Sequence, residues 1–342
     1  LRSFLTERKQ KVQVGEALSE SATISIGCPQ GSILSPLIFI IYMADIELWL
    51  KDVKLHSYAD DMSSSYSSSN ADKVIQKLEA DAHRILKFMA SNSLVANSSK
   101  TGFLFIQRSG SNLHAPLTIS IGSDTIMESS QFKILGLTVN NRLTWNDHVA
   151  NILPSLRQRT GALKRIAHHV PKQYLSIISN AIITSKIRYG IGIYGDVRIN
   201  ENDTQMGIMK DLQIVQNKAM RVVANKRISD KVRIEDLCTM TNTMSINRIT
   251  AVDKLSMVWK SVKNVDAPLS SLFKAIPGNT AMPSRANVRG DIKQTAKTSM
   301  GQRNVPYTSI RVWNDCDCES RSTARKYVPK VHFKNYVKQL PL

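Results

Sequence analysis

The sequence predicts an α+β fold, in which an antiparallel sheet with helices on one face is followed by an all-α domain. Two observations lead to this prediction. Up to residue 145, short stretches of alternating apolar and polar residues are interrupted by helical stretches, whereas only the helical period continues after that residue. In addition, Leu37 to Leu50 is apolar on nearly every side, which is typical of a buried helix, and we expect it to pack beneath the sheet.

Two strands and a helix start are expected near the beginning of the chain. Val12–Gly15 and Ala22–Ile26 alternate weakly, so we expect them to pair as the strands of one hairpin. Farther on, Ser35 is expected to be the N-cap of the apolar helix and Pro36 its first residue. Serine side chains accept the unpaired backbone N–H groups of a first turn, and proline has no N–H group to leave unpaired there.

A glycine-bounded loop, GCPQG, lies between these strands and the helix. Gly27 and Gly31 stand on either side of Pro29 and Gln30. Glycine lets a backbone approach a ligand closely, and the Gln30 amide both donates and accepts hydrogen bonds. The loop therefore fits a ligand-contacting segment, and an ordinary connection before a helix fits the same residues.

The segment KLHSYADDMSSSY, residues 54–66, predicts a strand, a two-residue turn at Asp60–Asp61 and a second strand. Neighbouring side chains of a regular strand point to opposite faces, so two adjacent carboxylates serve one site only where a turn redirects them. Two carboxylates this close repel each other, and a divalent cation relieves the repulsion. Phosphoryl-transfer enzymes use this arrangement, whereas an exposed polar turn is the alternative for the pair taken alone.

The pattern continues with a helix and further strands. Asp72 to Ala90 has one apolar stripe at helical spacing, and Gly102–Ile106 reads as a strand. Leu117–Ile126 alternates around Gly122–Ser123–Asp124, which predicts a hairpin, and Lys133–Val139 adds a second strand pair.

From residue 146 onward, the apolar residues recur at three- and four-residue spacing. The predicted helices are Asn146–Ala167, Lys172–Ile187, Gln205–Ala224 and Ile246–Lys263. The first of them carries a basic cluster, which consists of Arg157, Arg159, Lys164 and Arg165.

The positive charge is unevenly distributed along the 342 residues. Residues 1–150 hold 14 Lys and Arg against 14 Asp and Glu, whereas residues 151–342 hold 32 against 13, so the whole net charge of +19 lies in the second part. Lysine and arginine gain affinity for a polyanion by releasing its counterions. The asymmetry therefore indicates a nucleic acid as partner, with a merely solubilising surface as the alternative.

The four cysteines are too few for a disulfide framework, and no secretory signal opens the chain. We therefore expect an intracellular, reduced protein. Cys316 and Cys318 with His332 suggest zinc ligands, but no second cysteine pair follows at finger spacing, which argues against zinc. The apolar stretch from Leu37 reaches Asp45 too early for a membrane span. The first residue is leucine, so we expect a piece of a longer polyprotein.

Four motifs together resemble the reverse transcriptase of a non-LTR (LINE-type) retrotransposon. They follow one another in the order of that family, as Gly27–Pro36 (GCPQGSILSP), Tyr58–Asp61 (YADD), Asn97–Thr101 (NSSKT) and Phe132–Trp145 (FKILGLTVNNRLTW). The resemblance implies an RNA-directed DNA polymerase whose RNA template, DNA primer and deoxynucleoside triphosphate are its partners, with no membrane involved. It also implies a cytoplasmic ribonucleoprotein and a nuclear location.

The resemblance assigns roles to individual residues. Asp60 and Asp61 become the catalytic residues and the ligands of two Mg²⁺ ions, with Mn²⁺ as an alternative. Pro29, Gln30, Gly31 and Lys100 would contact the nucleotide and template, although Lys100 also fits a solvated loop. Leu135 and Gly136 would form the primer grip, where a strand glycine more commonly marks a bulge. The basic cluster Arg157, Arg159, Lys164 and Arg165 would bind nucleic acid.

The resemblance also divides the chain into parts. It implies a partial polymerase palm over residues 1–108, primer-grip-like hairpins over 109–145, a helical thumb-like domain over 146–267 and a basic C-terminal region over 268–342. The fingers and the strand with a further catalytic Asp lie upstream of the Pro-Gln-Gly motif in that family, and residues 1–342 contain neither. We therefore expect a fragment that is inactive alone, with a non-catalytic remnant that binds RNA or an RNA–DNA hybrid as the alternative function.

Overall fold

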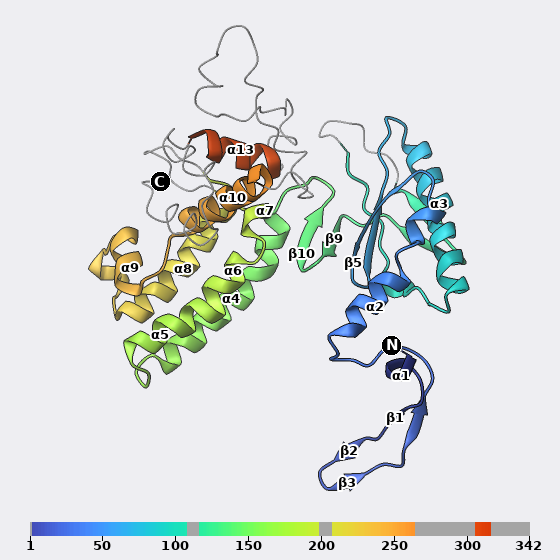
Figure 1. The fold of residues 1–342 in the computed structure, drawn as a ribbon. Helices are drawn as coiled ribbons and strands as arrows, with labels where there is room; N and C mark the ends of the chain where they lie inside the picture. Colours follow the sequence, from blue (N-terminus) through green and yellow to red (C-terminus); the bar gives the residue numbers. More distant parts are fainter. Residues whose placement is uncertain (1, 108–115, 198–206, 264–304, 316–342) are drawn as a thin grey trace. The chain divides into compact units, whose positions relative to one another are not determined.

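The computed structural model describes residues 2–107, 116–197, 207–263 and 305–315 (Figure 1). They form two compact units. The N-terminal unit contains residues 2–105 and 116–129, and the C-terminal unit contains residues 106–107 and the described residues from 130 onward. Helices and short antiparallel strand pairs alternate in the first unit, which agrees with the predicted α+β class. The boundaries of palm, primer-grip hairpins, thumb and C-terminal region stay predictions.

The N-terminal unit begins with helix α1 (Arg2–Leu5) and a long hairpin. Strands β1 (Arg8–Gln10) and β4 (Ala22–Ile24) pair at its base, and β2 (Gln13–Val14) pairs with β3 (Ala17–Leu18) at its end. The predicted pairing of Val12–Gly15 with Ala22–Ile26 is therefore wrong. Gly15 takes a φ of +62° and reverses the chain immediately, so the strand that contains Val14 pairs locally instead.

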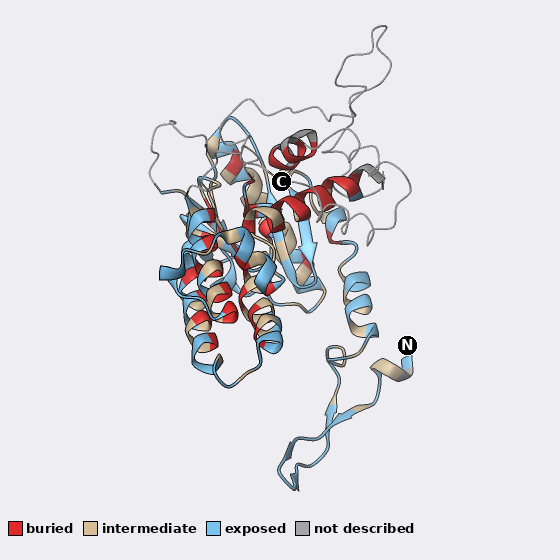
Figure 2. Ribbon diagram, turned by 90° about the vertical axis from the view of Figure 1, so that its left-hand side faces the viewer, coloured by how far each residue is buried: buried red, intermediate tan, exposed pale blue. Residues whose placement is uncertain are grey.

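Helix α2 (Leu34–Tyr42) and the 3₁₀ helix η1 (Ile46–Trp49) replace the single helix expected over 37–50. The expectation of a buried helix is wrong for α2, since none of its residues is buried and Ile40 and Ile41 are 60% and 66% exposed. The apolar composition of α2 favours burial, but no described element of the N-terminal unit covers its exposed face. Figure 2 shows the difference, with the N-terminal hairpin and α2 in blue and tan, whereas the helices of the C-terminal unit carry red stretches and α10 and α13 are largely red.

The predicted cap of α2 is also wrong. Ile33 occupies the N-cap position, and Ser35 lies inside the first turn. The Ser35 hydroxyl donates a hydrogen bond back to the Pro29 carbonyl, so it ties the helix to the preceding loop instead of capping the helix.

The rest of the N-terminal unit is arranged around helix α3 (Ala71–Ser91), which confirms the predicted helix. Asn70 caps it by accepting a 3.2 Å hydrogen bond from the Lys73 amide. Two hairpins belong to this unit, namely β5 (Lys54–Tyr58) with β6 (Asp61–Ser65) and β7 (Thr118–Ile121) with β8 (Asp124–Met127).

The strands do not join into one sheet. Every sheet among the described residues has two strands, in place of the larger antiparallel sheet that we expected. The expected strand Gly102–Ile106 contributes an isolated bridge between Phe103 and Glu128. This segment comes directly after the 3₁₀ helix η2 (Ser98–Lys100) in the chain. Local hairpin pairing is readable from alternation and turn residues, whereas pairing between distant strands is not.

The C-terminal unit starts with the hairpin β9 (Gln131–Ile134) and β10 (Leu137–Asn140), followed by helices. The helices are α4 (Asn146–Ile166), α5 (Lys172–Ser179), the π-helical turn η3 (Asn180–Thr184), α6 (Ser185–Arg188), α7 (Ile191–Tyr194), α8 (Ile208–Ala224), the 3₁₀ helix η4 (Ile228–Asp230), α9 (Ile234–Thr241), α10 (Ile246–Lys263) and α13 (Val305–Asp315). The predicted helices correspond to α4, to α5 through α6, to α8 and to α10. The sequence reading missed α7, α9 and α13.

One apolar core joins β10 to the helices of this unit. Leu137 of β10 packs with Val149 and Leu156 of α4, with Ile187 of α6 and with Leu212 of α8. A second core lies between α10 and α13, where Trp313 is 2% exposed. This burial fixes hairpin β9–β10 on a helical base, which matters for the site described below.

Two further expectations concern metals and membranes. Cys316, Cys318 and His332 lie outside the described residues, so the structure does not address their zinc-binding potential. Across the described ranges, no helix has both the length and the apolar character that a membrane crossing requires.

Candidate active site

The hairpin β5–β6 carries Asp60 and Asp61 at its exposed turn. Tyr58 pairs with Asp61, so the two turn residues are Ala59 and Asp60, and Asp61 is the first residue of β6. The turn therefore lies one residue earlier than predicted. Ala59 takes a φ of +53°, the positive angle that a tight two-residue hairpin turn needs at its first position. Both carboxylates are exposed.

Helix α3 holds the segment that leads into β5. Asp81 of α3 is fully buried, and its carboxylate accepts hydrogen bonds of 2.8 Å from the backbone amides of Asp52 and Val53. The Lys51 amide lies 3.3 Å from both Asp81 oxygens. On the exposed side, Lys77 Nζ lies 3.1 Å from the Asp52 carboxylate.

The sequence reading missed Asp81, although a signal was present. The buried residues of α3 are Val74, Asp81 and Phe88, at intervals of seven. Asp81 thus stands in the middle of the apolar stripe, where an ionised side chain is stable only with paired partners. A charged residue at a stripe position can therefore be read as a buried anchor.

Arg8 holds the beginning of the GCPQG loop. Arg8 donates hydrogen bonds to the carbonyls of Ile26, at 3.2 Å, and of Gly27. Gly27 and Gly31 both take positive φ angles, of +79° and +81°, which is the conformation that favours glycine. Gln30 and Gly31 are exposed and Pro29 is half-buried, so the predicted contact residues of this loop, Pro29, Gln30 and Gly31, form a surface turn.

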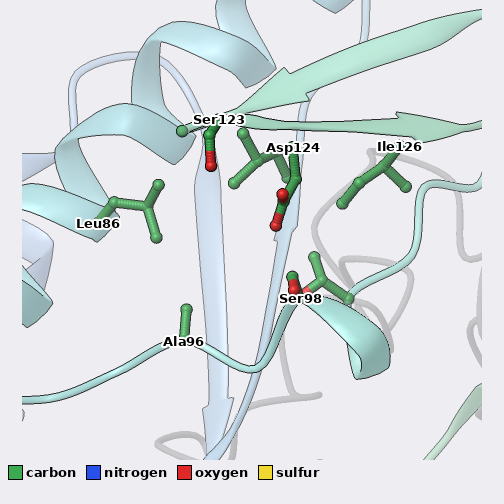
Figure 3. A pocket seen from close by; sticks show the side chains of 9 residues that line it. Leu86, Ala96, Ser98, Ser123, Asp124 and Ile126 are labelled. Carbon is green, nitrogen blue, oxygen red and sulfur yellow. The ribbon is translucent and has the colours of Figure 1, made fainter.

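Lys100 lies at the end of η2 and is exposed. A pocket of about 170 Å³ lies beside this turn, between α3, η2 and the end of hairpin β7–β8 (Figure 3). Its lining residues are Leu86, Ala96, Ser98, Thr101, Ile121, Gly122, Ser123, Asp124 and Ile126. Lys100 is absent from this lining, and the Asp124 carboxylate points into the pocket. A phosphate group would be repelled there, so we do not assign the pocket to a triphosphate.

Leu135 and Gly136 form the turn of hairpin β9–β10 and are not strand or bulge residues. Both have positive φ angles, +46° and +82°, as a type I′ turn requires. The Tyr189 hydroxyl donates a 2.7 Å hydrogen bond to the Leu135 carbonyl. A Cβ atom at Gly136 would lie 3.2 Å from the Tyr189 ring, so the phenol packs directly on the turn. Leu135 is 43% and Tyr189 56% exposed, which leaves this surface accessible.

His148 and Tyr194 form a buried aromatic pair that supports hairpin β9–β10. The His148 ring lies 4.8 Å from the Tyr194 ring, and its Nδ1 accepts a 3.3 Å hydrogen bond from the Thr138 amide of β10. Burial lowers the pKa of His148, and the positive charges of Lys186 and Lys133 lower it further. Burial also raises the pKa of the Tyr194 phenol. His148 is therefore a neutral acceptor that fixes β10 to α4.

The basic residues of α4 fall into two groups. Arg157, Lys164 and Arg165 are exposed, as a nucleic-acid contact would require. Arg159 is half-buried and donates a 2.7 Å hydrogen bond to the Ile182 carbonyl in the π-helical turn η3. Its guanidinium thus has a structural contact inside the C-terminal unit that the sequence did not indicate.

The oxygen atoms of Asp60 and Asp61 match the ligands that Mg²⁺ prefers. This ion is commonly held by one or two carboxylates, with water and substrate phosphates completing its shell. Throughout the parts of the chain that the structure describes, no three His, Cys, Asp or Glu side chains form a ready-made metal site. The donor chemistry therefore fits a metal that is completed by further ligands.

Comparison with known families identifies the segment that contains the YADD turn. Residues 1–139, which include the GCPQG loop, the YADD turn and hairpin β9–β10 up to Val139, match the family described as reverse transcriptase (RNA-dependent DNA polymerase). Residues 1–139 belong to the reverse transcriptase family. The predicted relationship to LINE-type reverse transcriptases is thus confirmed.

Three curated relatives extend the similarity beyond residue 139. The chain is 26% identical over 234 residues to a probable RNA-directed DNA polymerase from transposon X-element, 24% over 315 residues to the RNA-directed DNA polymerase from mobile element jockey, and 27% over 237 residues to a probable RNA-directed DNA polymerase from transposon BS, all from Drosophila melanogaster. These alignments cover 65%, 87% and 66% of this chain.

The same alignments cover 24%, 32% and 25% of the relatives, so the chain spans about a quarter to a third of their length. No solved structure matches the chain. The reverse transcriptase relationship therefore rests on sequence, and the geometry described above shows how this chain arranges the residues that carry it.

Proposed function

We propose that this chain supplies the YADD part of an RNA-directed DNA polymerase of a non-LTR retrotransposon. The observation that carries the proposal is the exposed turn at Asp60 and Asp61, which lies inside the segment that matches the reverse transcriptase family. The proposed reaction adds a deoxynucleotide from its triphosphate to a DNA 3′ end on an RNA template. A further carboxylate would come from a palm segment that residues 1–342 do not contain.

Asp60 and Asp61 would hold Mg²⁺, or Mn²⁺ in its place. When bound, two such ions stabilise the charge that develops on the attacking and leaving oxygens of phosphoryl transfer. The chain's own contribution is to hold two negative charges next to each other at a turn that is open to substrate. The positive φ of Ala59 and the Tyr58–Asp61 pair fix this arrangement.

The remaining residues would orient the substrates. Pro29, Gln30 and Gly31 of the GCPQG loop are proposed to contact the nucleotide and template. Lys100 is proposed to approach the triphosphate from the end of η2, and the turn at Leu135–Gly136 to contact the primer. Arg157, Lys164 and Arg165 are proposed to hold the phosphate backbone, which a basic surface does without reading sequence.

The test joins this chain to the rest of the jockey polymerase, in place of the matching segment of that relative. Primer extension on an RNA template is then compared between Asp60→Asn, Asp61→Asn and Asp124→Asn. Asp124 is the matched control, because it is also the first strand residue after a two-residue hairpin turn in the same unit.

We expect Asp60→Asn and Asp61→Asn to lower the rate by on the order of 10²–10³-fold, because several kcal/mol of charge stabilisation is lost. Hybrid binding should persist in both variants, and Asp124→Asn should extend primers normally. Full activity of either YADD variant would refute the proposed site. Primer extension at an equal rate by the unjoined 342 residues would refute the need for a carboxylate from outside the chain.

A further inference from the structure

Asp81 is the most completely buried acidic group in the described part of the N-terminal unit, and most of its partners are backbone amides. Its exposed fraction is zero. Its oxygens accept from the amides of Lys51, Asp52 and Val53, and Arg84 pairs with it one turn farther along α3. Three consecutive N–H groups thus point at one carboxylate, an arrangement that recognises negative charge.

The carboxylate is ionised in this setting. Burial by itself would raise the pKa of Asp81, but the hydrogen bonds from Asp52, Val53, Arg84 and Lys51 outweigh it and lower the pKa below the ordinary value of 3.8. A buried charge strongly favours the one geometry in which all its donors reach it, because moving a donor away leaves a buried charge without that partner. Asp81 therefore fixes the position of residues 51–53.

Those residues lead directly into the YADD hairpin. Val53 precedes Lys54, the first residue of β5, and β5 runs without interruption to Tyr58 and the turn. Lys77, on the same helix, adds the 3.1 Å ion pair to Asp52. Among the residues that the structure describes, no third strand pairs with this two-stranded hairpin, so contacts at its base have a large influence on where its turn lies.

Helix α3 holds a second hairpin in the same manner. The Glu79 carboxylate accepts a 2.8 Å hydrogen bond from the Ser120 amide of β7. Two carboxylates of one 21-residue helix thus bind backbone amides, one in the segment that leads into β5 and the other in β7. This makes α3 a rigid reference for the strands of the unit, and it supplies a matched control, because Glu79 holds a hairpin that carries no YADD residue.

We propose that Asp81 is a positioning residue for the YADD turn. By binding the backbone of residues 51–53 to α3, Asp81 would hold this turn in the position that metal and substrate require. This inference rests on the proposed function of Asp60 and Asp61. Phosphoryl transfer depends on the alignment of reacting atoms, and a misplacement of about 1 Å can lower the rate by about 100-fold. Asp81 touches neither substrate nor metal in this proposal.

The test has two parts, the first on the 342-residue chain itself. Hydrogen exchange is measured in the parent chain, in Asp81→Asn and in Glu79→Gln. Asparagine replaces one accepting oxygen by a donating NH₂ group, so the amides of Asp52 and Val53 should exchange faster in Asp81→Asn, and so should the β5–β6 ladder. Glu79→Gln should leave residues 51–65 unchanged, because it changes a contact of β7 alone.

The second part uses the chain joined to the rest of the jockey polymerase. Asp81→Asn should lower kcat by about 100-fold and raise the Mg²⁺ concentration needed for half-maximal rate, while primer–template affinity stays within about twofold. Glu79→Gln should keep the parent kcat. If Asp81→Asn does not fold, Lys77→Met takes its place, because it removes only the partly exposed ion pair with Asp52. It should also raise the Mg²⁺ concentration needed for half-maximal rate, by a smaller factor.

The outcomes separate the two proposals. If Asp81→Asn lowers the melting temperature but leaves kcat and the Mg²⁺ dependence of the folded protein unchanged, Asp81 is a structural residue and this inference is wrong. An unchanged Mg²⁺ dependence in Lys77→Met overturns it equally when Asp81→Asn cannot be measured. If Asp60→Asn is fully active in the same assay, the failure belongs to the proposed function instead.

Discussion

Replacement of Gly190 by alanine should destabilise the C-terminal unit strongly. Gly190 has a φ of +73°, and a Cβ atom there would lie 2.8 Å from Leu137 Cδ2 and 3.0 Å from Leu137 Cδ1. Leu137 is a core residue and has little room to withdraw. The left-handed backbone costs an alanine about 1–2 kcal/mol, and overpacking of a core costs about 1–3 kcal/mol. We therefore expect a loss of about 2–5 kcal/mol.

Two other glycines of the same unit separate the contributions to this loss. Gly195 has an ordinary φ of −75°, but its Cβ would lie 2.6 Å from the Ile191 carbonyl oxygen and from Thr250 Cγ2, so Gly195→Ala measures steric cost alone. Gly161 lies inside α4, where a Cβ would meet nothing closer than Arg165 Nη1 at 3.9 Å. Gly161→Ala should stabilise the unit by roughly 0.5–1 kcal/mol, because alanine has the better helix propensity.

The assay is equilibrium unfolding in urea, followed by tryptophan fluorescence, with the three variants and the parent measured side by side. The expected order of stability is Gly161→Ala above the parent and both other variants below it. A Gly190→Ala protein within about 0.5 kcal/mol of the parent would show that Leu137 and the turn at 189–190 rearrange easily, which would refute the reasoning from the contact distances.

Three further predictions concern pH, salt and solubility. Because the pKa of folded His148 lies below its ordinary value of 6.5, the unfolded chain takes up the proton first, so stability should fall as the pH drops below 6.5, and His148→Gln should weaken that dependence in urea titrations from pH 8 to 5. Binding of the 342-residue chain to an RNA–DNA hybrid should weaken with salt, and Lys164→Gln should lower the log–log slope by about 0.9 if that lysine contacts phosphate; an unchanged slope excludes the contact. Ile41, 66% exposed on α2, should promote self-association, so Ile41→Ser should reduce apolar dye binding and light scattering without loss of helix content, whereas equal scattering from both proteins would contradict this.

Local structure was predictable wherever one residue pattern determines it. The stripe from Asp72 to Ala90 matches α3 to within one residue at each end, and the alternation around Gly122 gives hairpin β7–β8. The residue pattern of 54–66 also predicted a hairpin turn at Asp60 and Asp61. The turn was misplaced by one residue because aspartate is the more common turn residue, yet Ala59 is the one that takes the positive φ.

Properties that depend on distant partners were not predictable. Helix α2 was expected to be buried, and its exposure depends on which elements lie beside it and not on its own composition. The single sheet did not form because register between non-adjacent strands carries no local signal. Arg159 looked like part of an exposed basic cluster, since only the fold shows that the Ile182 carbonyl lies within its reach. The short helix α7 lies between two glycines and was too short for its period to be visible.

The π-helical turn η3 has a consequence for how the sequence can change. Leu175, Ser179, Ile183 and Ile187 are all buried and lie four residues apart. Each step of four residues in an α-helix overshoots a full turn by about 40°, so three steps would carry Ile187 about 120° away from the face of Leu175. The extra residue that a π-helical turn accommodates takes back about 100° of this drift. Eleven α-helical steps also end about 20° from a whole number of turns, so removal of a single residue within 180–184 would convert the turn to an ordinary α-helix and leave Ile187 on the face of Leu175.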